Sequence, residues 1–244
     1  MEAFYRAGGI PRVMDHLGEL LDTESMTCTG KTISENLKEY TYSYPENPEI
    51  IKTVEEPFST TGGVAVLDGN LAPHTAISKP GAIDPALHRF TGKAKCYNSE
   101  EEAEEAILGG KIEKGDVVVI RYEGPKGGPG MREMFKAMKY MYGMGLAKSA
   151  ALITDGRFSG TNNGCFVGHI SPEAAEGGPL AIVEDGDEIS IDVIDGKLEL
   201  HVSDEEIERR KKAWVRPEKP IPNGYLRLYS KVASSADKGA IIEC

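Results

Sequence analysis

One stretch, residues 116–169, decides the fold; it reads DVVVIRYEGPKGGPGMREMFKAMKYMYGMGLAKSAALITDGRFSGTNNGCFVGH. It starts with a β-branched run at 117–120, apolar on both faces, which is typical of a buried strand. Glycines and prolines at 124–130 then interrupt regular structure. Apolar residues spaced three and four apart from Met131 to Tyr142 predict a helix that ends at the glycines 143 and 145. Residues 150–154 predict a second buried strand.

A strand, a helix and a strand in this order form a βαβ unit, in which the two strands are parallel. The loops 124–130 and 155–164 should therefore face a shared crevice. Glu133 is expected in the first turn of the helix, where the macrodipole favours a negative charge, and Ser159 lies on the opposite loop. A carboxylate that holds a hard cation and a hydroxyl that moves a proton make half of a metal-assisted lyase or hydrolase site. The alternative is that Glu133 only stabilises the helix and the methionines only fill the core.

Three segments carry a resemblance to a known family. They are GGVAVLDGNLAP at 62–73, GPKGGPGMREM at 124–134 and LITDGRFSGTNNGCFVGHISPEAAEGGP at 152–179. Together they closely resemble the dihydroxy-acid and sugar-acid dehydratase family. The resemblance extends from AGGIPRVM at 7–14 to YLRLYSKVASSADKGAI at 225–241, and the motifs occur in the family's order.

The resemblance implies a hydro-lyase that converts a 2,3-dihydroxy acid to a 2-keto acid through an enol. It implies that Ser159 is the base on C2, that Glu133 is a ligand of Mg²⁺, and that Thr161 helps to hold the substrate carboxylate. In the family, Mg²⁺ lies beside an iron–sulfur cluster, [2Fe-2S] or [4Fe-4S], which acts as a Lewis acid on the 3-hydroxyl. A nearby divalent cation would help to lower the pKa of the serine.

Within the family, the motifs favour the branched-chain dihydroxy-acid dehydratases over the sugar-acid dehydratases. The expected substrate is therefore 2,3-dihydroxyisovalerate or 2,3-dihydroxy-3-methylvalerate, in isoleucine and valine biosynthesis, with a sugar acid such as an aldonate or phosphogluconate as the alternative. The resemblance also implies a fold: α/β with much β, a swivelling β/β/α barrel-like domain flanked by helices. In the family its active site lies near a homodimer interface.

The chain also departs from the family pattern. The cluster-binding cysteines and the other Mg²⁺ ligands belong to an N-terminal half, of which only the last helix is matched here. The four cysteines, Cys28, Cys96, Cys165 and Cys244, are scattered without a CxxC pair, so no iron–sulfur ligands are expected in this chain. Two interpretations stay open: a partner of a separately encoded N-terminal half, or a folded fragment without catalysis. Arg132 stands where the family motif predicts proline.

Three parts are expected along the chain. Residues 1–40 resemble the helical end of the N-terminal, cluster-binding domain, residues 41–61 read as a linker, and residues 62–244 form the barrel-like domain. A helix is predicted at 3–22, and its apolar face is the expected docking surface for the missing half. The sequence GKT at 30–32 suggests a phosphate-binding loop, but Thr32 and Glu35 favour a capping box that opens a short helix through residue 38.

The remaining patterns predict short elements. Strands are expected at 63–67, 76–78, 89–97, 180–183, 188–193 and 197–202, and helices at 100–108 with a Ser99 cap, after Ser171, after Ser203 and at 225–235. The acidic residues that open the helix at 100 are interpreted as a solvated face. His74, His88 and His169 are interpreted as solvated or structural residues.

The composition excludes some classes of partner. The chain has 39 Asp and Glu against 28 Lys and Arg, a net charge of −11, which argues against nucleic acid or an anionic membrane. No apolar run approaches the roughly 20 residues of a membrane-spanning helix. Four unpatterned cysteines fit a reducing environment, so a cytoplasmic protein is expected.

Overall fold

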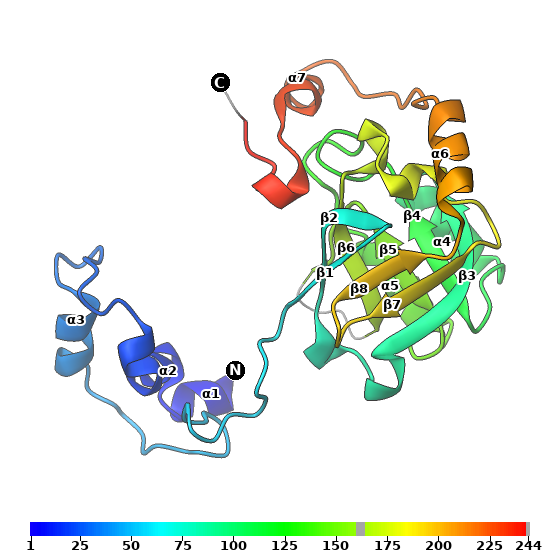
Figure 1. Cartoon of the computed structure of the whole chain (residues 1–244). Helices are drawn as coiled ribbons and strands as arrows, with labels where there is room; N and C mark the ends of the chain where they lie inside the picture. The colour runs from blue at the N-terminus through cyan, green and yellow to red at the C-terminus, as the bar shows by residue number, and fades with distance from the viewer. Residues whose placement is uncertain (160–163, 243–244) are drawn as a thin grey trace. The chain divides into compact units, whose positions relative to one another are not determined.

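The computed structural model describes residues 1–159 and 164–242, and divides the chain into two compact units, 1–62 and 63–244. The two units are described separately. Figure 1 shows the helices of the first unit and the barrel of the second.

The first unit contains three α-helices, α1 (Glu2–Arg6), α2 (Gly9–Leu17) and α3 (Ile33–Glu39), and a 3-10 turn, η1 (Gly18–Leu20), that follows α2. The prediction of one helix over 3–22 was wrong, because Gly8 interrupts it with a φ of 110°. A β-carbon at Gly8 would lie 2.7 Å from the Cβ of Arg12, so only glycine fits this break. The capping box of α3 is confirmed: Thr32 accepts the amide of Glu35, and the Glu35 side chain accepts the amide of Thr32.

The segment after α3 contacts α2 in spite of its irregular backbone. The guanidinium carbon of Arg12 lies 3.6 Å from the ring centre of Tyr42, a cation–π contact. His16 Nδ1 lies 3.0 Å from the carbonyl oxygen of Lys52, and Ile51 is buried. Residues 40–62 are therefore grouped with the helices of the first unit.

The second unit is built on a closed eight-stranded barrel with the strand order β1-β2-β6-β5-β4-β3-β7-β8. Its strands are β1 (Ala65–Gly69), β2 (Ala72–Ser78), β3 (Arg89–Tyr97), β4 (Asp116–Ile120), β5 (Ala151–Thr154), β6 (Cys165–Ser171), β7 (Glu188–Asp192) and β8 (Lys197–Leu200). The strands β3, β4, β5 and β6 run parallel to one another, and a parallel contact between β1 and β8 closes the barrel. The predicted βαβ unit is confirmed, because β4 and β5 are parallel neighbours.

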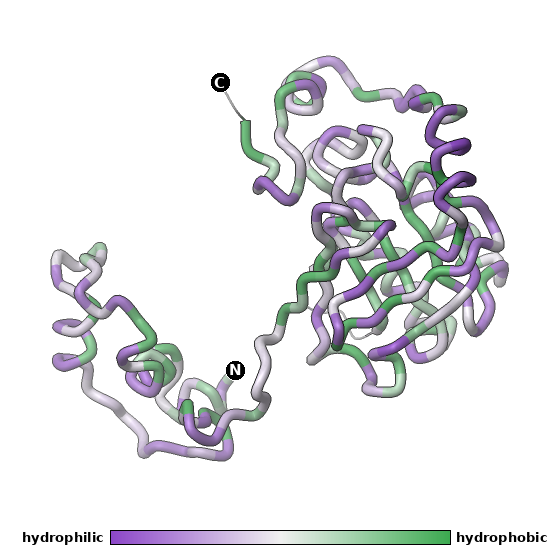
Figure 2. The backbone as a smooth tube through the Cα atoms, viewed as in Figure 1, coloured by the Kyte–Doolittle hydropathy of each residue, from purple (hydrophilic) through white to green (hydrophobic). Residues whose placement is uncertain are grey.

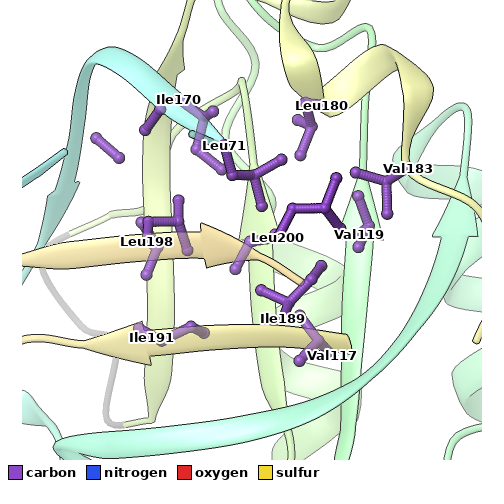
Figure 3. Close-up of a cluster of buried hydrophobic side chains, with 14 of the residues drawn as sticks. Leu71, Val117, Val119, Ile170, Leu180, Val183, Ile189, Ile191, Leu198 and Leu200 are labelled. Carbon is purple, nitrogen blue, oxygen red and sulfur yellow. The ribbon is translucent and has the colours of Figure 1, made fainter. Parts of the chain in front are cut away.

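The alternating side chains of β4 explain why this strand is apolar throughout. Val117 and Val119 face the interior, where they join a core supplied by the other strands and by the turn at 179–182 (Figure 3). Val118 and Ile120 face outward and pack against α4 (Glu100–Leu108) and α5 (Phe135–Gly143). Each side of the barrel wall at β4 is thus covered by apolar groups, as in other buried parallel strands.

Two further helices follow the barrel. In α6 (Asp204–Ala213) only Ile207 is buried, and Figure 2 shows this helix as almost wholly hydrophilic. Ser203 caps α6 by accepting the amide of Glu206, as predicted, but the Glu206 side chain pairs with arginines instead of completing a capping box. The last helix, α7 (Tyr225–Val232), confirms the helix predicted near the C-terminus.

Several predictions around β6 were wrong. The strand β6 itself was not predicted, because its glycine and histidine hide the strand pattern. No α-helix starts at Ser171: this residue ends β6, a cis bond joins it to Pro172, and a 3-10 turn, η4 (Ala174–Glu176), follows. The strand predicted at 180–183 is also a 3-10 turn, η5 (Pro179–Ile182), since a short apolar run does not distinguish a strand from a buried turn.

Across residues 1–159 and 164–242, every helix is too short or too polar to cross a membrane.

Candidate active site

Three loops meet at one end of the barrel, because β4, β5 and β6 are parallel and all end there. They are the glycine segment after β4 (121–134), the described part of the serine loop after β5 (155–159), and the turn after β6 (172–178). The first two loops are in direct contact near their described ends: the amide of Arg157 donates to the carbonyl of Arg132 over 3.0 Å, and the amide of Met134 donates to the carbonyl of Arg157 over 2.8 Å. Residues 160–163 of the predicted crevice lie outside the described residues.

Asp155 joins all three loops. Its fully buried carboxylate accepts the amides of Tyr122 and Glu123 in the glycine segment, over 3.1 and 2.9 Å, and the amide of Ala174 in the turn, over 2.8 Å. Burial raises the pKa of Asp155 to about 6, and these amides act in the opposite direction.

Glu173 makes a second connection to the glycine segment. Its carboxylate accepts the amides of Lys126 and Gly127, each over 2.8 Å, and the residue is 1% exposed. A β-carbon at Gly124 would lie 2.7 Å from a Glu173 oxygen. The glycines of the segment therefore allow its backbone to approach buried carboxylates closely.

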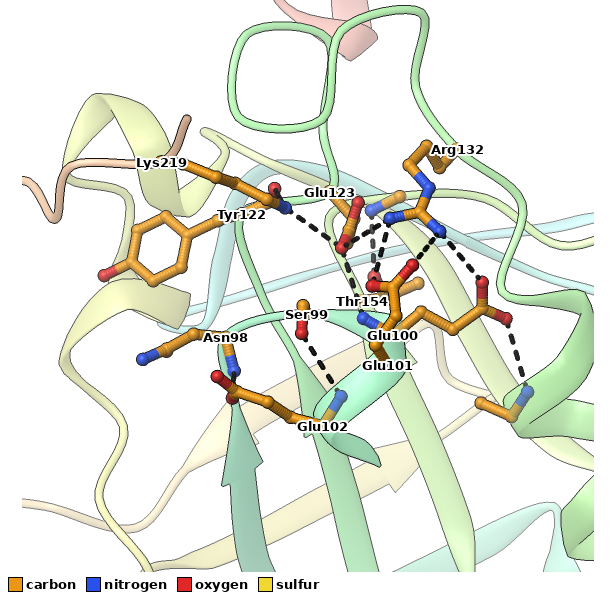
Figure 4. A network of polar contacts seen from close by, with 12 residues as sticks. Asn98, Ser99, Glu100, Glu101, Glu102, Tyr122, Glu123, Arg132, Thr154 and Lys219 are labelled. Atoms are coloured by element: carbon orange, nitrogen blue, oxygen red, sulfur yellow. Dashed lines mark hydrogen bonds and ion pairs between the residues drawn. The ribbon is translucent and has the colours of Figure 1, made fainter. Parts of the chain in front are cut away.

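A network of charged groups lies beside this loop junction (Figure 4). Arg132 contacts Glu101 at 2.6 Å and, at 3.5 Å each, Glu100 and the fully buried Glu123. Lys219 donates to the same Glu123 oxygen over 3.0 Å. Arg132, which stands where proline was expected, thus pairs with the exposed Glu101 and also places its charge near the buried carboxylates of Glu100 and Glu123.

Glu100 shows that the acidic start of α4 is not simply a solvated face. It is 4% exposed, and its carboxylate accepts the amides of Lys136 and Ala137 at the start of α5, over 2.9 and 3.3 Å. Glu100 therefore supplies the acceptor that the first turn of α5 requires.

Glu133 lies outside α5, which corrects its predicted place in the first helical turn. Met134 is the N-cap of α5, and Glu133 pairs with Arg157 of the serine loop in an isolated β-bridge. Their side chains lie 3.5 Å apart, and the Glu133 side chain is 39% exposed. The backbone hydrogen bonds to Arg157 engage residues 132–134 outside the helix, so α5 starts later than the apolar spacing predicts.

Ser159 is half-buried two residues beyond Arg157, so both predicted site residues lie at the same junction. The ammonium group of Lys79 donates to the carbonyl oxygen of Ser159 over 3.2 Å. Burial, followed by the positive charges of Arg157 and Lys79, lowers the pKa of His169. Lys79 and Arg157 thus place positive charge at the described part of the serine loop, where Arg157 already pairs with Glu133. No sequence pattern indicated Lys79, which follows β2.

The third predicted residue, Thr161, lies outside the described residues. A hollow of about 800 Å³ lies beside the glycine segment, and it is lined by Tyr122, Lys126, Lys219 and the C-terminal segment, not by Glu133 or Ser159. This hollow is therefore separate from the two predicted site residues.

The side chains present fit the implied cofactors to different degrees. Glu133 offers an accessible carboxylate, the kind of ligand that Mg²⁺ prefers, but residues 1–159 and 164–242 contain no group of three potential metal ligands. Cys28 is exposed, whereas Cys96 and Cys165 belong to the barrel core, where burial raises the pKa of each thiol to about 12. The described cysteines therefore do not fit an iron–sulfur cluster.

The raised pKa of Glu173 predicts how pH changes stability. Burial and the charge of Asp155 raise it to about 7, above about 4.3 in the unfolded chain, although the amides of Lys126 and Gly127 act in the opposite direction and Glu176 adds to the rise. The folded state binds the extra proton, so this contribution to stability is present below about pH 4 and is lost as the pH rises through about 7.

We therefore expect the free energy of unfolding of the wild type to decrease, relative to that of Glu173→Gln, as the pH is raised from about 4.5 to 7.5. Denaturant titrations of both proteins across this range measure the difference. Equal pH dependence in both proteins would contradict the assignment.

Comparison with known proteins agrees with the motifs. Residues 49–240 match the model of the dihydroxy-acid/6-phosphogluconate dehydratase C-terminal domain. The chain is 52% identical to the dihydroxy-acid dehydratases of Acetivibrio thermocellus and Aquifex aeolicus, over its whole length and 44% of each relative. It is 52% identical to that of Methanosarcina barkeri over 98% of the chain and 43% of the relative. The chain thus spans less than half the length of these relatives, and it belongs to the dihydroxy-acid/6-phosphogluconate dehydratase family, of which it represents the C-terminal part.

Proposed function

We propose that this chain is the C-terminal part of a dihydroxy-acid dehydratase, a hydro-lyase that converts a 2,3-dihydroxy acid to a 2-keto acid. The observation that carries the proposal is the bridge between Glu133 and Arg157, which brings a half-exposed carboxylate to the loop that holds Ser159. The names of the relatives favour a branched-chain dihydroxy acid, 2,3-dihydroxyisovalerate or 2,3-dihydroxy-3-methylvalerate, over a sugar acid.

Ser159 acts as the base in this proposal. Its deprotonated hydroxyl takes the proton from C2 of the substrate, the C–H electron pair forms the C2–C3 double bond, and the 3-hydroxyl leaves as hydroxide. The hydroxide takes the proton from Ser159 and becomes water, which restores the deprotonated serine. The resulting enol then tautomerises to the 2-keto acid. Lys79, which bonds the Ser159 carbonyl, and Arg157 place positive charge at the loop, and this charge favours the serine alkoxide and the substrate carboxylate.

Glu133 holds Mg²⁺ in the proposal, and the ion when bound supplies charge that stabilises the anionic forms of substrate and serine. The other Mg²⁺ ligands and the cluster are assigned to an N-terminal half, since the described cysteines here do not fit a cluster. We also propose that residues 1–40 are the end of that half, that Thr161 contacts the substrate carboxylate, and that the complete enzyme is a cytoplasmic homodimer.

The proposal is tested by reconstitution. This chain is assayed with 2,3-dihydroxyisovalerate alone and after anaerobic mixing with the cluster-loaded N-terminal part of the Aquifex aeolicus relative, and the keto acid is measured. Activity only in the mixture is the expected result. The matched control replaces this chain with the relative's own C-terminal part. If that control is active and this chain is inactive on the dihydroxy acids and on a panel of sugar acids, the proposal is wrong.

Glu133→Gln provides a test of the metal assignment. An amide is a weaker ligand than a carboxylate, so the Mg²⁺ concentration for half-maximal activity of the mixture should rise about tenfold or more, with the fold unchanged. Glu105→Gln, at an exposed position of α4, is the control. An unchanged Mg²⁺ requirement in Glu133→Gln would exclude this residue as a ligand.

A further inference from the structure

The loop junction contains buried carboxylates that the proposed reaction does not use, and Asp155 and Glu173 are the two that bind amides of more than one loop or of a neighbouring loop. Among the described residues, these two carboxylates accept five hydrogen bonds, each from a backbone amide. Asp155 connects the serine loop to the glycine segment and to the turn after β6, and Glu173 connects that turn to the glycine segment. Each of the three loops is thus fixed to the other two.

A continuous series of hydrogen bonds leads from Glu173 to the serine loop. The carboxylate holds the amides of Lys126 and Gly127, and tight turns follow, in which Gly128 donates to the carbonyl of Gly124 and Met131 to that of Gly128, each over 2.8 Å. The carbonyl of Met131 then accepts Nε of Arg157 over 2.7 Å. A displacement of the glycine segment at Lys126 is therefore expected to move Arg157, the residue that bridges to Glu133.

The energetics favour a role beyond stability. Buried carboxylates lose hydration, and the raised pKa values of Asp155 and Glu173 show that their amide partners do not fully compensate for this loss. Apolar residues of similar volume often stabilise a fold at least as well as buried charged groups do. What only a carboxylate provides here is two oxygens that fix several amides of an irregular loop in one arrangement.

We propose that Asp155 and Glu173 are positioning residues, which lock the glycine segment against the serine loop and so hold Glu133 and Ser159 in register. The inference rests on the function proposed above for Glu133 and Ser159. The exact positions of Glu133 and Ser159 matter because small displacements of catalytic groups cause large losses of rate.

Amide hydrogen exchange of this chain tests the lock without an activity assay. In Glu173→Gln one of the two oxygens becomes a donor, so Lys126 or Gly127 loses its acceptor. We expect the amides of Arg157 and Met134, which form the bridge, to exchange roughly tenfold faster, and those of β4 and β5 to stay unchanged. Glu176→Gln is the control, because Glu176 contacts the side chain of Lys126 in place of backbone amides.

Two results would overturn the proposal at this stage. One is unchanged exchange at Arg157 and Met134, and the other is equal acceleration in the barrel strands, which would indicate a role in global stability alone. Asp155→Asn should accelerate exchange of the Arg157 and Met134 amides more than that of β4 and β5, where exchange rises only with its loss of global stability. If Asp155→Asn does not fold, Glu173→Gln alone tests the proposal.

The second stage uses the reconstituted enzyme. Glu173→Gln should lower kcat roughly tenfold and leave KM within about a factor of two, since substrate binding tolerates loop motion that the chemical step does not. Glu176→Gln should retain the wild-type kcat. If Glu173→Gln accelerates exchange only at Arg157 and Met134 but leaves kcat unchanged, the buried carboxylate fixes the loops without positioning the catalytic groups. Inactivity of the wild-type mixture would instead contradict the proposed function, while the exchange result would still decide whether the lock exists.

Discussion

Replacement of Ser159 by alanine should reduce the turnover of the reconstituted enzyme by roughly 10²–10⁴-fold, the usual contribution of a general acid or base. The loss should appear in kcat, because the hydroxyl acts on the C2 proton in the transition state and contributes little to substrate binding. The serine is half-buried on a loop whose backbone is fixed at Gly156 and Arg157, so the fold should not change. Steady-state kinetics and circular dichroism of the variant measure both effects.

Ser149→Ala is the matched control for this experiment. Ser149 is also half-buried, but it precedes β5, whereas the serine loop follows that strand, and its hydroxyl donates only to the carbonyl of Leu146. The control should turn over at the wild-type rate. Normal turnover in Ser159→Ala would contradict the assignment of the base, and Lys79 or His169 would then be the next groups to test at this loop.

Replacement of Asp155 by alanine should cause the largest loss of stability among the site residues. It leaves the buried amides of Tyr122, Glu123 and Ala174 without their acceptor, and each such amide costs about 1–3 kcal/mol, so the free energy of unfolding should fall by about 3 kcal/mol or more. Asp155→Asn, which retains one acceptor oxygen, should be intermediate. Denaturant unfolding followed by circular dichroism measures both variants.

Asp195→Ala is the control for the stability experiment. Its carboxylate pairs with Arg89 at 2.8 Å, but the side chain is 64% exposed, and such surface pairs contribute about 1 kcal/mol or less. A loss in Asp155→Ala no larger than in Asp195→Ala would show that water or a shifted backbone satisfies the three amides.

The sequence by itself determined the elements whose signals are local. The β-branched run of β4 and the apolar run of β5 each predicted a strand, and the order strand, helix, strand predicted that these are parallel. Ser99 and Thr32 marked helix starts correctly, because a cap is decided by a side chain and amides only three residues apart. The motifs around Glu133 and Ser159 also predicted the family that the comparisons show.

Only the tertiary structure decided where the charged residues lie. Glu100 and Glu173 have ordinary surface patterns in the sequence, yet both are buried, because amides from distant segments reach their oxygens. Glu133 was displaced from α5 by hydrogen bonds to Arg157, 24 positions further along the chain. Closure of the barrel between β1 and β8 likewise depends on strands more than a hundred residues apart. Local patterns record the hydrophobic and capping preferences of neighbouring residues, whereas the partner of a buried polar group is known only after distant segments have met.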